Sequence, residues 1–324
     1  MRTAILGTAG YTGQETLDRV LSHPELGVVA LGSDSLAGRN AGALDVRLDG
    51  DLPAFTTNAE ALATEADLIF ACLGHEEAAA IEPPAGAVVI DLSGAHRLPA
   101  DLYPAWYGWE HPRASELDRW SYGLPELWPP EGPLVASPGC YATAALLALA
   151  PLAGVVEPAS VVVDAKSGVS GAGRGLAASS HAGVVLENVS AYQIGSHRHS
   201  PEISQALGFP VCFVPHLLPV RRGLLVTCYA QATSEGLRER LEEAYAGSLV
   251  VRLLPDGVAP ELARVQGTDA VELAVYEDRE TGKTIVICAL DNLGKGAAGQ
   301  AVQNANLVLG LDETLGMRLS GVLV

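Results

Sequence analysis

The residues best suited to covalent chemistry surround Cys140. The turn residues 137–140 (SPGC) precede an apolar, helix-like run from Ala144 to Leu152. This spacing predicts that the Cys140 sulfur lies at or just before a helix N-terminus, where free N–H groups and the helix dipole stabilise a thiolate. The Pro-Gly turn argues against an ordinary core position, so we expect a nucleophile. A small buried core residue is the usual fate of a free cysteine, and we expect it for the other four: Cys72, Cys212, Cys228 and Cys288.

Two histidines flank an arginine in the segment His197, Arg198 and His199. No third Cys or His follows at the spacing of a zinc site, so we expect no metal and favour general acid/base work beside a substrate anion. Farther along, His216 and Arg222 fall in a predicted loop between strands. Anion recognition and a structural salt bridge are equally good interpretations of that loop.

Two glycine-rich segments have the composition of anion-binding loops. Residues 7–13 are spaced GxxGxxG rather than GxGxxG, but they lie between a predicted strand and a predicted helix. Glycines there let a pyrophosphate approach the backbone and the helix N-terminus, and the alternative is a tight turn without a ligand. The loop consists of Gly7, Thr8, Ala9, Gly10, Tyr11, Thr12 and Gly13. The second segment, 166–174 (KSGVSGAGR), is either an anion cradle or a flexible crossover loop.

The end of the second predicted strand gives two opposing signals about the nucleotide. Ser33 and Asp34 follow this strand, and Arg39 lies a few residues later. An acid at this place binds the ribose 2′-hydroxyl of NAD, whereas an arginine accommodates the 2′-phosphate of NADP. Asp34 therefore favours NAD and Arg39 favours NADP, unless both are solvated loop charges.

Length and charge limit the class of protein. The chain has 324 residues, with 20 Lys+Arg against 38 Asp+Glu and a net charge of −18, which predicts a globular protein of two domains and disfavours nucleic acid and anionic membranes as partners. The longest apolar stretch, 144–156, is too short to cross a bilayer, and the first residues lack the apolar stretch of a secretory signal. Five cysteines without a CxxC pair fit a reducing cytoplasm.

The elements that must position these residues are predicted to form an α/β protein. Short apolar runs bounded by turn residues predict the parallel strands of an N-terminal, doubly wound Rossmann-like domain. After about residue 157, longer strand-like runs predict an α+β domain with a mainly antiparallel sheet, including a hairpin of 272–277 with 283–288. The runs of the first domain are 3–6, 28–31, 67–72 and 87–92.

Several short motifs follow one another in a definite order along the chain. They are 7–13 (GTAGYTG), 23–25 (HPE), 91–93 (DLS), 122–126 (YGLPE), 138–141 (PGCY), 164–174 (DAKSGVSGAGR), 197–202 (HRHSPE), 215–217 (PHL), 222–223 (RG) and 291–301 (DNLGKGAAGQA). This ordered set resembles the N-acetyl-gamma-glutamyl-phosphate reductases, arginine-pathway relatives of aspartate-semialdehyde dehydrogenase. Each motif is modestly specific, but the ordered set covers nearly the whole chain and is highly specific.

The resemblance implies an activity and a set of roles. The activity is NADPH-dependent reduction of N-acetyl-L-glutamyl 5-phosphate to the 5-semialdehyde and phosphate through a thioester on Cys140, with His197 and His199 supplying the acid/base. Substrate binding is implied for Arg174, Arg198, His216 and Arg222. NADP(H) binding is implied for residues 7–13 and for Ser33, Arg39, Leu73, Ser93, Ser170, Gly171 and Asn292.

The resemblance also implies a domain division and an assembly. We expect an NADP-binding domain at 1–140 plus about 295–324, a catalytic, substrate and oligomerisation domain at 141–294, and a cytoplasmic homodimer or tetramer. Asp34 stands where the family often has a basic residue, which weakens the NADP assignment.

Two other functions remain as alternatives to this reductase activity. The sister reductase of lysine synthesis acts on an aminoadipyl phosphate attached to an acidic carrier protein, which a net charge of −18 opposes. A non-catalytic NADP-binding regulator would keep the loop at 7–13 but would not need Cys140.

Overall fold

A computed structural model of the chain describes residues 1–48, 50–175, 178 and 181–321. The chain forms two compact units. Unit 1 comprises Met1–Ala100, Glu110–Pro138 and Ala297–Met317, whereas unit 2 comprises Asp101–Trp109, Gly139–Gly296 and the described residues from Arg318 onward.

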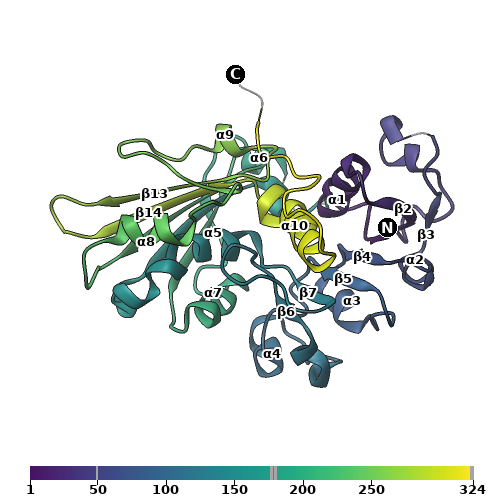
Figure 1. Ribbon diagram of the computed structural model, residues 1–324, viewed down its shortest axis with the longest axis horizontal. Coiled ribbons are helices and arrows are strands. Elements are labelled where there is room, and N and C mark those ends of the chain that lie inside the picture. The colour runs from purple at the N-terminus through teal and green to yellow at the C-terminus, as the bar shows by residue number, and fades with distance from the viewer. Residues whose placement is uncertain (49, 176–177, 179–180, 322–324) are drawn as a thin grey trace. The chain divides into compact units, whose positions relative to one another are not determined.

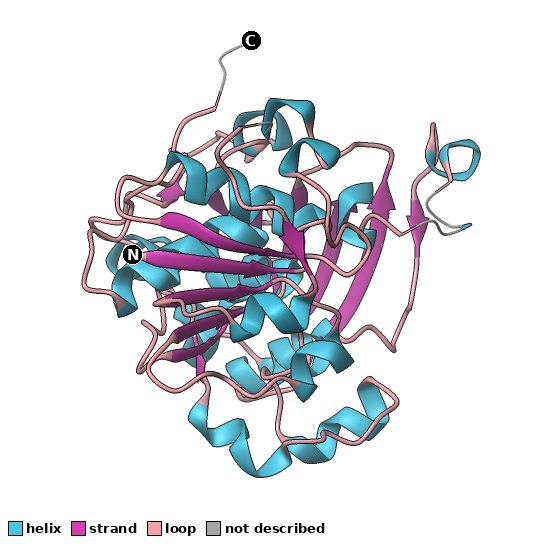
Figure 2. Cartoon of the chain, turned by 90° about the vertical axis from the view of Figure 1, so that its right-hand side faces the viewer, coloured by secondary structure: helices cyan, strands magenta, loops and turns pink. Residues whose placement is uncertain are grey.

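Unit 1 is built on a seven-stranded, wholly parallel sheet of order β3-β2-β1-β4-β5-β7-β6 (Figure 2, magenta). Its strands are β1 (Arg2–Leu6), β2 (Gly27–Gly32), β3 (Phe55–Thr56), β4 (Leu68–Ala71), β5 (Val88–Asp91), β6 (Ser121–Tyr122) and β7 (Leu134–Ala136). Its helices are α1 (Tyr11–Ser22), α2 (Asn58–Ala63), α3 (His75–Ala80) and α10 (Gly299–Val308), labelled in Figure 1. Every residue of β4 is buried, as expected for a parallel strand covered on both faces.

Helices α1 and α10 complete the core of unit 1. The buried positions of α1 include Gly13, Thr16, Leu17 and Val20, which recur at the helical period and place one face against the sheet. One core cluster joins Leu17 and Val20 to strand residues and to three residues of α10: Ala301, Val302 and Ala305. The C-terminal helix is therefore part of the packing that supports the N-terminal strands.

Unit 2 contains a mixed seven-stranded sheet of order β12-β13-β14-β11-β8-β10-β9. Its strands are β8 (Val162–Gly168), β9 (Ser190–Ala191), β10 (Cys212–Leu218), β11 (Leu224–Ala230), β12 (Val251–Leu253), β13 (Val271–Glu277) and β14 (Thr284–Leu290). Its helices are α4 (Tyr103–Trp106), α5 (Cys140–Leu149), α6 (Ala182–Val185), α7 (His199–Leu207), α8 (Leu237–Ala244) and α9 (Leu262–Val265), with a π-helical turn η9 (Gly294–Ala298) at the junction with unit 1. Pairs β8/β10 and β12/β13 are parallel, and the other pairs are antiparallel.

Helix α5 is the central helix of unit 2. All its residues from Tyr141 to Leu149 are buried, which is the expected place for a helix that is apolar on every side. It packs against β11, β14 and α7. The helix that begins with Cys140 is thus held between a sheet and a second helix.

The expected fold class is confirmed, with a parallel Rossmann-like sheet and a second, largely antiparallel sheet. Two segments expected with the first domain lie in unit 2. Residues 101–109 belong there because the Arg198 guanidinium stacks 5.4 Å from the centre of the Tyr107 ring. Residues 318–321 also belong there, and the Arg318 N–H donates to the Asp269 carboxylate over 2.8 Å.

No helix in the described ranges combines the length and the apolar composition needed to cross a membrane.

Candidate active site

The loop at 7–13 in unit 1 is shaped so that only glycine fits at two of its positions. Gly7 has a φ of +68°, and a Cβ atom there would lie 2.2 Å from the carbonyl oxygen of Cys72. A Cβ atom at Gly13 would lie 2.4 Å from the carbonyl oxygen of Gly7. The loop leads into the N-terminus of α1, whose first turn has no acidic residue and whose N-cap, Gly10, makes no side-chain cap. Close backbone approach and a bare helix N-terminus suit a pyrophosphate.

The other predicted nucleotide residues of unit 1 follow the carboxyl ends of neighbouring strands. The loop at 7–13 follows β1, Ser33 follows β2, Leu73 follows β4 and Ser93 follows β5. The strand order reverses between β1 and β4, which is where doubly wound sheets bind nucleotides. A Cβ atom at Gly7 would lie 3.4 Å from Leu73 Cδ2, so Leu73 borders the loop. Residues 7–13 and these three positions therefore fit a dinucleotide.

The Asp34 carboxylate is hydrogen-bonded to Asn58. Its carboxylate accepts the backbone N–H of Asn58 over 2.9 Å and the Asn58 side-chain amide over 3.2 Å. The amide oxygen of Asn58 accepts the N–H of Gly7 over 2.9 Å. Asn58 thus ties Asp34 to the glycine loop, which leaves the exposed Arg39 as the charge that suits a 2′-phosphate.

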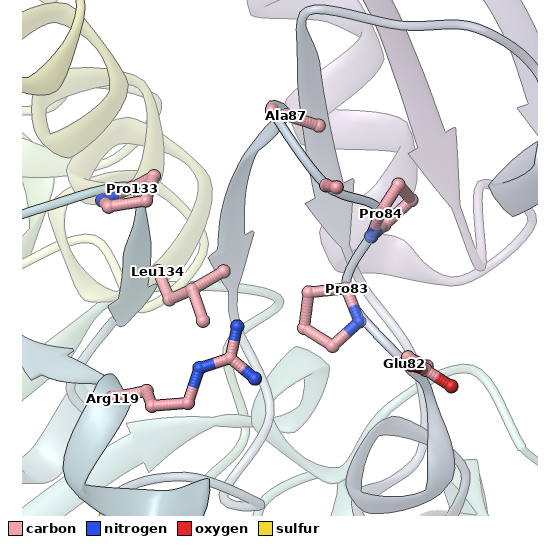
Figure 3. Close-up of a pocket in the computed structure, with 9 residues that line it drawn as sticks. Glu82, Pro83, Pro84, Ala87, Arg119, Pro133 and Leu134 are labelled. Atoms are coloured by element: carbon pink, nitrogen blue, oxygen red, sulfur yellow. The ribbon is translucent and has the colours of Figure 1, made fainter.

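A pocket of about 390 Å³ in unit 1 lies at the wrong edge of the sheet for a nucleotide (Figure 3). It is lined mainly by residues that precede β5, β6 and β7, including Pro83, Pro84, Arg119 and Pro133. Ligands of open α/β sheets bind outside the carboxyl ends of the strands, whereas these residues lie at the amino ends. The pocket contains none of the predicted site residues.

Cys140 is the first residue of α5, and its N-cap is Gly139. The predicted position at a helix N-terminus is the one observed, and the first-turn N–H groups of α5 can stabilise a thiolate or an oxyanion. The N–H of Gly139 donates to Glu202 Oε1 over 2.8 Å. Gly296 of η9 lies close to the cysteine on another side. A Cβ atom added at position 296 would lie 2.9 Å from Cys140 Cβ. Cys140 and the residue before it are therefore held from two sides, by Glu202 and by Gly296.

The other four cysteines differ in exposure. Cys228 and Cys288 are buried and Cys72 is half-buried, and burial raises the pKa of Cys72 to about 12 and the pKa values of the other two above the usual range. These three remain thiols. The expectation of a buried Cys212 is wrong: it is exposed at the start of β10.

An aromatic cluster surrounds His197 beside Cys140. The rings of Tyr141, Tyr192, His199 and Phe213 have centroids 4.8–5.6 Å from the His197 ring. Burial, followed by the charge of Arg198, lowers the pKa of His197 to about 4. Its Nδ1 accepts the backbone N–H of His199 over 3.1 Å. His197 is thus a neutral residue whose ring accepts the N–H of His199, the first residue of α7.

The hydroxyls of Tyr141 and Tyr192 form a short chain. Burial raises the pKa of Tyr192 to about 12, and its hydroxyl donates to that of Tyr141 over 3.1 Å. The Tyr141 hydroxyl donates to the carbonyl oxygen of His216 over 3.2 Å. This chain connects α5 to β10.

Three residues predicted to bind NADP(H) come together in unit 2. The Asn292 amide donates to Ser170 Oγ over 2.9 Å, and its oxygen accepts the N–H of Gly223 over 2.8 Å. A Cβ atom at Gly171 would lie 3.8 Å from the same Asn292 amide nitrogen. Ser170, Gly171 and Asn292 therefore form one polar group.

The predicted substrate residues occupy different surroundings. Arg222 donates from Nε to the buried Asp291 carboxylate over 2.5 Å, Arg198 lies over the Tyr107 ring, and Arg174 is exposed. His216 lies 3.2 Å from the Asp164 carboxylate. Because side chains alternate along a strand, the His216 ring points to the opposite face of the sheet from Phe213, which contacts the His197 ring. His216 therefore lies in strand β10 and not in the predicted loop, and its side chain points away from the aromatic cluster, although its carbonyl oxygen accepts the Tyr141 hydroxyl.

The described residues contain no group of three or more Cys, His, Asp or Glu side chains arranged to hold a metal ion.

Comparison with known proteins identifies the family. Residues 2–131 match the family described as semialdehyde dehydrogenase, NAD binding domain, and residues 140–292 match semialdehyde dehydrogenase, dimerisation domain. The N-acetyl-gamma-glutamyl-phosphate reductase of Salinispora arenicola is 45% identical, and that of Pelotomaculum thermopropionicum 43%, each alignment covering 99% of both chains. The chain belongs to the N-acetyl-gamma-glutamyl-phosphate reductase family. It is an oxidoreductase, and these relatives support neither the aminoadipyl enzyme nor the regulator.

Solved structures of more distant enzymes share the fold of this reductase family member. Aspartate semialdehyde dehydrogenase II of Vibrio cholerae, complexed with ASA, matches with a TM-score of 0.73 and 19% identity, over 95% of this chain and 98% of the other. The aspartate semialdehyde dehydrogenase of Candida albicans, solved with NADP, matches with a TM-score of 0.62 and 17% identity, over 95% and 99%. At these identities the likeness establishes the fold.

Sequence reasoning did not single out three residues that shape the two sites. Asn58 lies 51 positions from Gly7, Glu202 lies 63 positions from Gly139, and Gly296 is far from Cys140 along the chain. Glu202 and Gly296 lie within two of the sequence motifs, at 197–202 and 291–301. These motifs indicate that the segments matter, but they do not predict which residues touch.

Proposed function

We propose that this protein reduces N-acetyl-L-glutamyl 5-phosphate with NADPH to N-acetyl-L-glutamate 5-semialdehyde and phosphate, a step of L-arginine biosynthesis. The observation that carries the proposal is the position of Cys140, the first residue of α5, beside the helix that begins with His199. The names of the relatives supply the substrate. The geometry supports acyl transfer to a cysteine.

Cys140 begins the reaction. Its thiolate attacks the carbonyl carbon of the acyl phosphate, a tetrahedral intermediate forms, and the carbon–oxygen bond to phosphate breaks with the electron pair leaving on phosphate. The product is a thioester on Cys140. The N–H groups in the first turn of α5 stabilise the negative oxygen of the intermediate.

The cofactor is held by the residues at the carboxyl edge of the unit 1 sheet. We propose that residues 7–13 bind the pyrophosphate, that Ser33 and Arg39 bind the 2′-phosphate, and that Leu73 and Ser93 border the remainder of the dinucleotide. In unit 2, Ser170, Gly171 and Asn292 bind the nicotinamide portion or the departing phosphate. When bound, NADPH supplies the hydride that reduces the thioester.

We assign the acid/base role to His199 rather than His197. Its neighbour His197 has a pKa near 4 because it is buried, and its Nδ1 is engaged with the His199 N–H. His199 protonates the oxygen of the thiohemiacetal on Cys140 and takes the proton back as the carbon–sulfur bond breaks, which releases the semialdehyde and the thiolate.

The substrate carboxylate requires a cationic partner. We propose Arg174, Arg198 and Arg222 for this role, because a guanidinium can bind a carboxylate through two hydrogen bonds. His216 instead supports Asp164 on the far face of the sheet.

We further propose that unit 1 is the NADP-binding domain, that unit 2 is the catalytic and oligomerisation domain, and that the protein is a cytoplasmic homodimer or tetramer. The match of residues 140–292 to a dimerisation domain supports the assembly.

The test is the reverse reaction, in which N-acetyl-L-glutamate semialdehyde, phosphate and NADP are converted to the acyl phosphate and NADPH. The rate is measured as the increase in NADPH absorbance. We expect phosphate-dependent turnover that Cys140→Ala abolishes and that the matched control Cys212→Ser, at an exposed cysteine, leaves unchanged. Parallel reactions with NAD measure the cofactor preference. Substantial turnover in Cys140→Ala would refute covalent catalysis, and an inactive wild-type protein would refute the substrate assignment.

A further inference from the structure

Glu202 is a buried carboxylate beside the nucleophile that the proposed chemistry does not use. Only 2% of its surface is exposed, and it lies in the first turn of α7, three residues after His199. Its Oε1 accepts the N–H of Gly139, the N-cap residue of α5, over 2.8 Å. One side chain therefore connects the N-termini of the two helices that begin with Cys140 and His199.

The placement of this carboxylate suits both helix ends. A negative charge in the first turn of α7 interacts favourably with the dipole of its own helix. The N–H of Gly139 lies one residue before Cys140, so the hydrogen bond fixes the turn from which the cysteine side chain projects. Hydrogen bonds that involve a carboxylate are about twice as strong as those between neutral groups.

We propose that Glu202 is a positioning residue that holds Cys140 at its working distance from the acid/base group at the start of α7. This inference rests on the proposed function, because it concerns the geometry of the same nucleophile. The alternative is that Glu202 only stabilises the fold, as other buried carboxylates of unit 2 do.

Glu272 provides the matched control for that alternative. It is also buried, and on β13 its carboxylate accepts hydrogen bonds from Arg264 Nε over 2.7 Å and from the N–H of Glu261 over 3.2 Å. It touches neither α5 nor α7 through these bonds. Loss of Glu272 reports the cost of removing a buried carboxylate without disturbing the turn before Cys140.

Steady-state kinetics of the reverse reaction distinguish positioning from stability. A displacement of about 1 Å in a catalytic group can reduce turnover about 100-fold, so we expect Glu202→Ala to lose kcat about 30- to 100-fold while KM changes less than about threefold. Glu202→Gln keeps an oxygen that can accept the Gly139 N–H, and we expect it to restore kcat to within about fivefold of wild type. Glu272→Gln should stay within about twofold of wild type in kcat.

Alkylation of Cys140 by iodoacetamide provides a readout that does not depend on the substrate. It is measured on the Cys140 peptide by mass spectrometry, in a Cys212→Ser background that removes the exposed thiol. Glu202→Gln and Glu202→Ala both lack the carboxylate charge, but only glutamine can keep the hydrogen bond. We expect alkylation at least about fivefold slower in the alanine variant than in the glutamine variant, because the sulfur leaves the helix N-terminus.

Two results would overturn the proposal. The first is equal kcat and equal alkylation rates in the alanine and glutamine variants, and the second is a Glu202→Ala enzyme with wild-type kcat. If the alanine variant does not fold, Glu202→Asp replaces it: the shorter side chain cannot reach Gly139 without moving α7, so wild-type kcat in that variant is also contrary to the proposal. An inactive wild-type enzyme refutes the substrate assignment alone, since the alkylation comparison still tests the role of Glu202.

Discussion

The contact between Gly296 and Cys140 makes a quantitative prediction for Gly296→Ala. The new Cβ atom would lie 2.9 Å from Cys140 Cβ, 3.1 Å from the carbonyl oxygen of Asp291 and 3.2 Å from Leu290 Cδ1. Carbon atoms in contact prefer a separation of about 3.5–4.0 Å. The two Cβ atoms must therefore separate by about 0.6 Å to reach even the shorter limit.

The displacement falls mainly on the cysteine. The carbonyl oxygen of Asp291 and the Leu290 side chain also lie close to the new Cβ atom. Moving the alanine away from Cys140 would therefore bring it into contact with these two groups. Because a misplacement of about 1 Å costs about 100-fold in turnover, we expect kcat to fall about 10- to 100-fold. Overpacking of this kind also lowers the free energy of unfolding by about 1–3 kcal/mol.

The assay is the phosphate-dependent reverse reaction together with urea unfolding of the same preparations. Gly154→Ala is the matched control, because Gly154 lies in unit 2 in a helical turn and a Cβ atom there would meet nothing within 4 Å. We expect the control to keep wild-type kcat. A Gly296→Ala enzyme with kcat within about twofold of wild type would show that Cys140 tolerates the displacement and would refute the reasoning.

Two further predictions concern pH and the cofactor. Burial lowers the pKa of His197 from 6.5 to about 4 in the folded protein, so the unfolded chain binds this proton first as the pH falls, and the free energy of unfolding should decrease by about 2 kcal/mol between about pH 7 and about pH 5. Urea unfolding of His197→Asn, whose side chain does not titrate, should show a decrease smaller by that amount, and an unchanged decrease would contradict the burial argument. Arg39→Ala should raise KM for NADP at least about tenfold and leave KM for NAD within about twofold, because only NADP presents a 2′-phosphate. The control is Arg47→Ala, which removes an exposed arginine paired with Asp45, and equal effects of Arg39→Ala on both cofactors would remove Arg39 from the 2′-phosphate site.

Local patterns in the sequence predicted most of the elements. The glycine loop lies between β1 and α1, the hairpin expected at 272–277 and 283–288 is β13 and β14, and Cys140 begins a helix. Each of these depends on residues close together in the chain, where apolar periodicity and turn residues give a direct signal. Cys212 was misassigned because one cysteine at the start of a strand carries no information about which face it occupies.

Contacts between distant segments could not be predicted. Nothing near Asn58 indicates that its amide meets Gly7, and the role of Gly296 is visible only when η9 lies against α5. The same holds for the two histidines, whose spacing suggested a pair with one function. Their different burial and the hydrogen bond from the His199 N–H to His197 separate them.

The core of unit 1 has a consequence for the order in which the chain folds during synthesis. Ala301, Val302 and Ala305 of α10 pack into the cluster that supports β1 and β4, yet they leave the ribosome only after residues 139–296. Until then the parallel sheet lacks one of its covering helices and exposes apolar surface. Strands β8 to β14 of unit 2 are therefore synthesised before the helix that completes the unit 1 core beneath the glycine loop. A chain that ended near residue 296 would contain Cys140 and strands β8 to β14, but its unit 1 sheet would lack α10 and expose apolar surface.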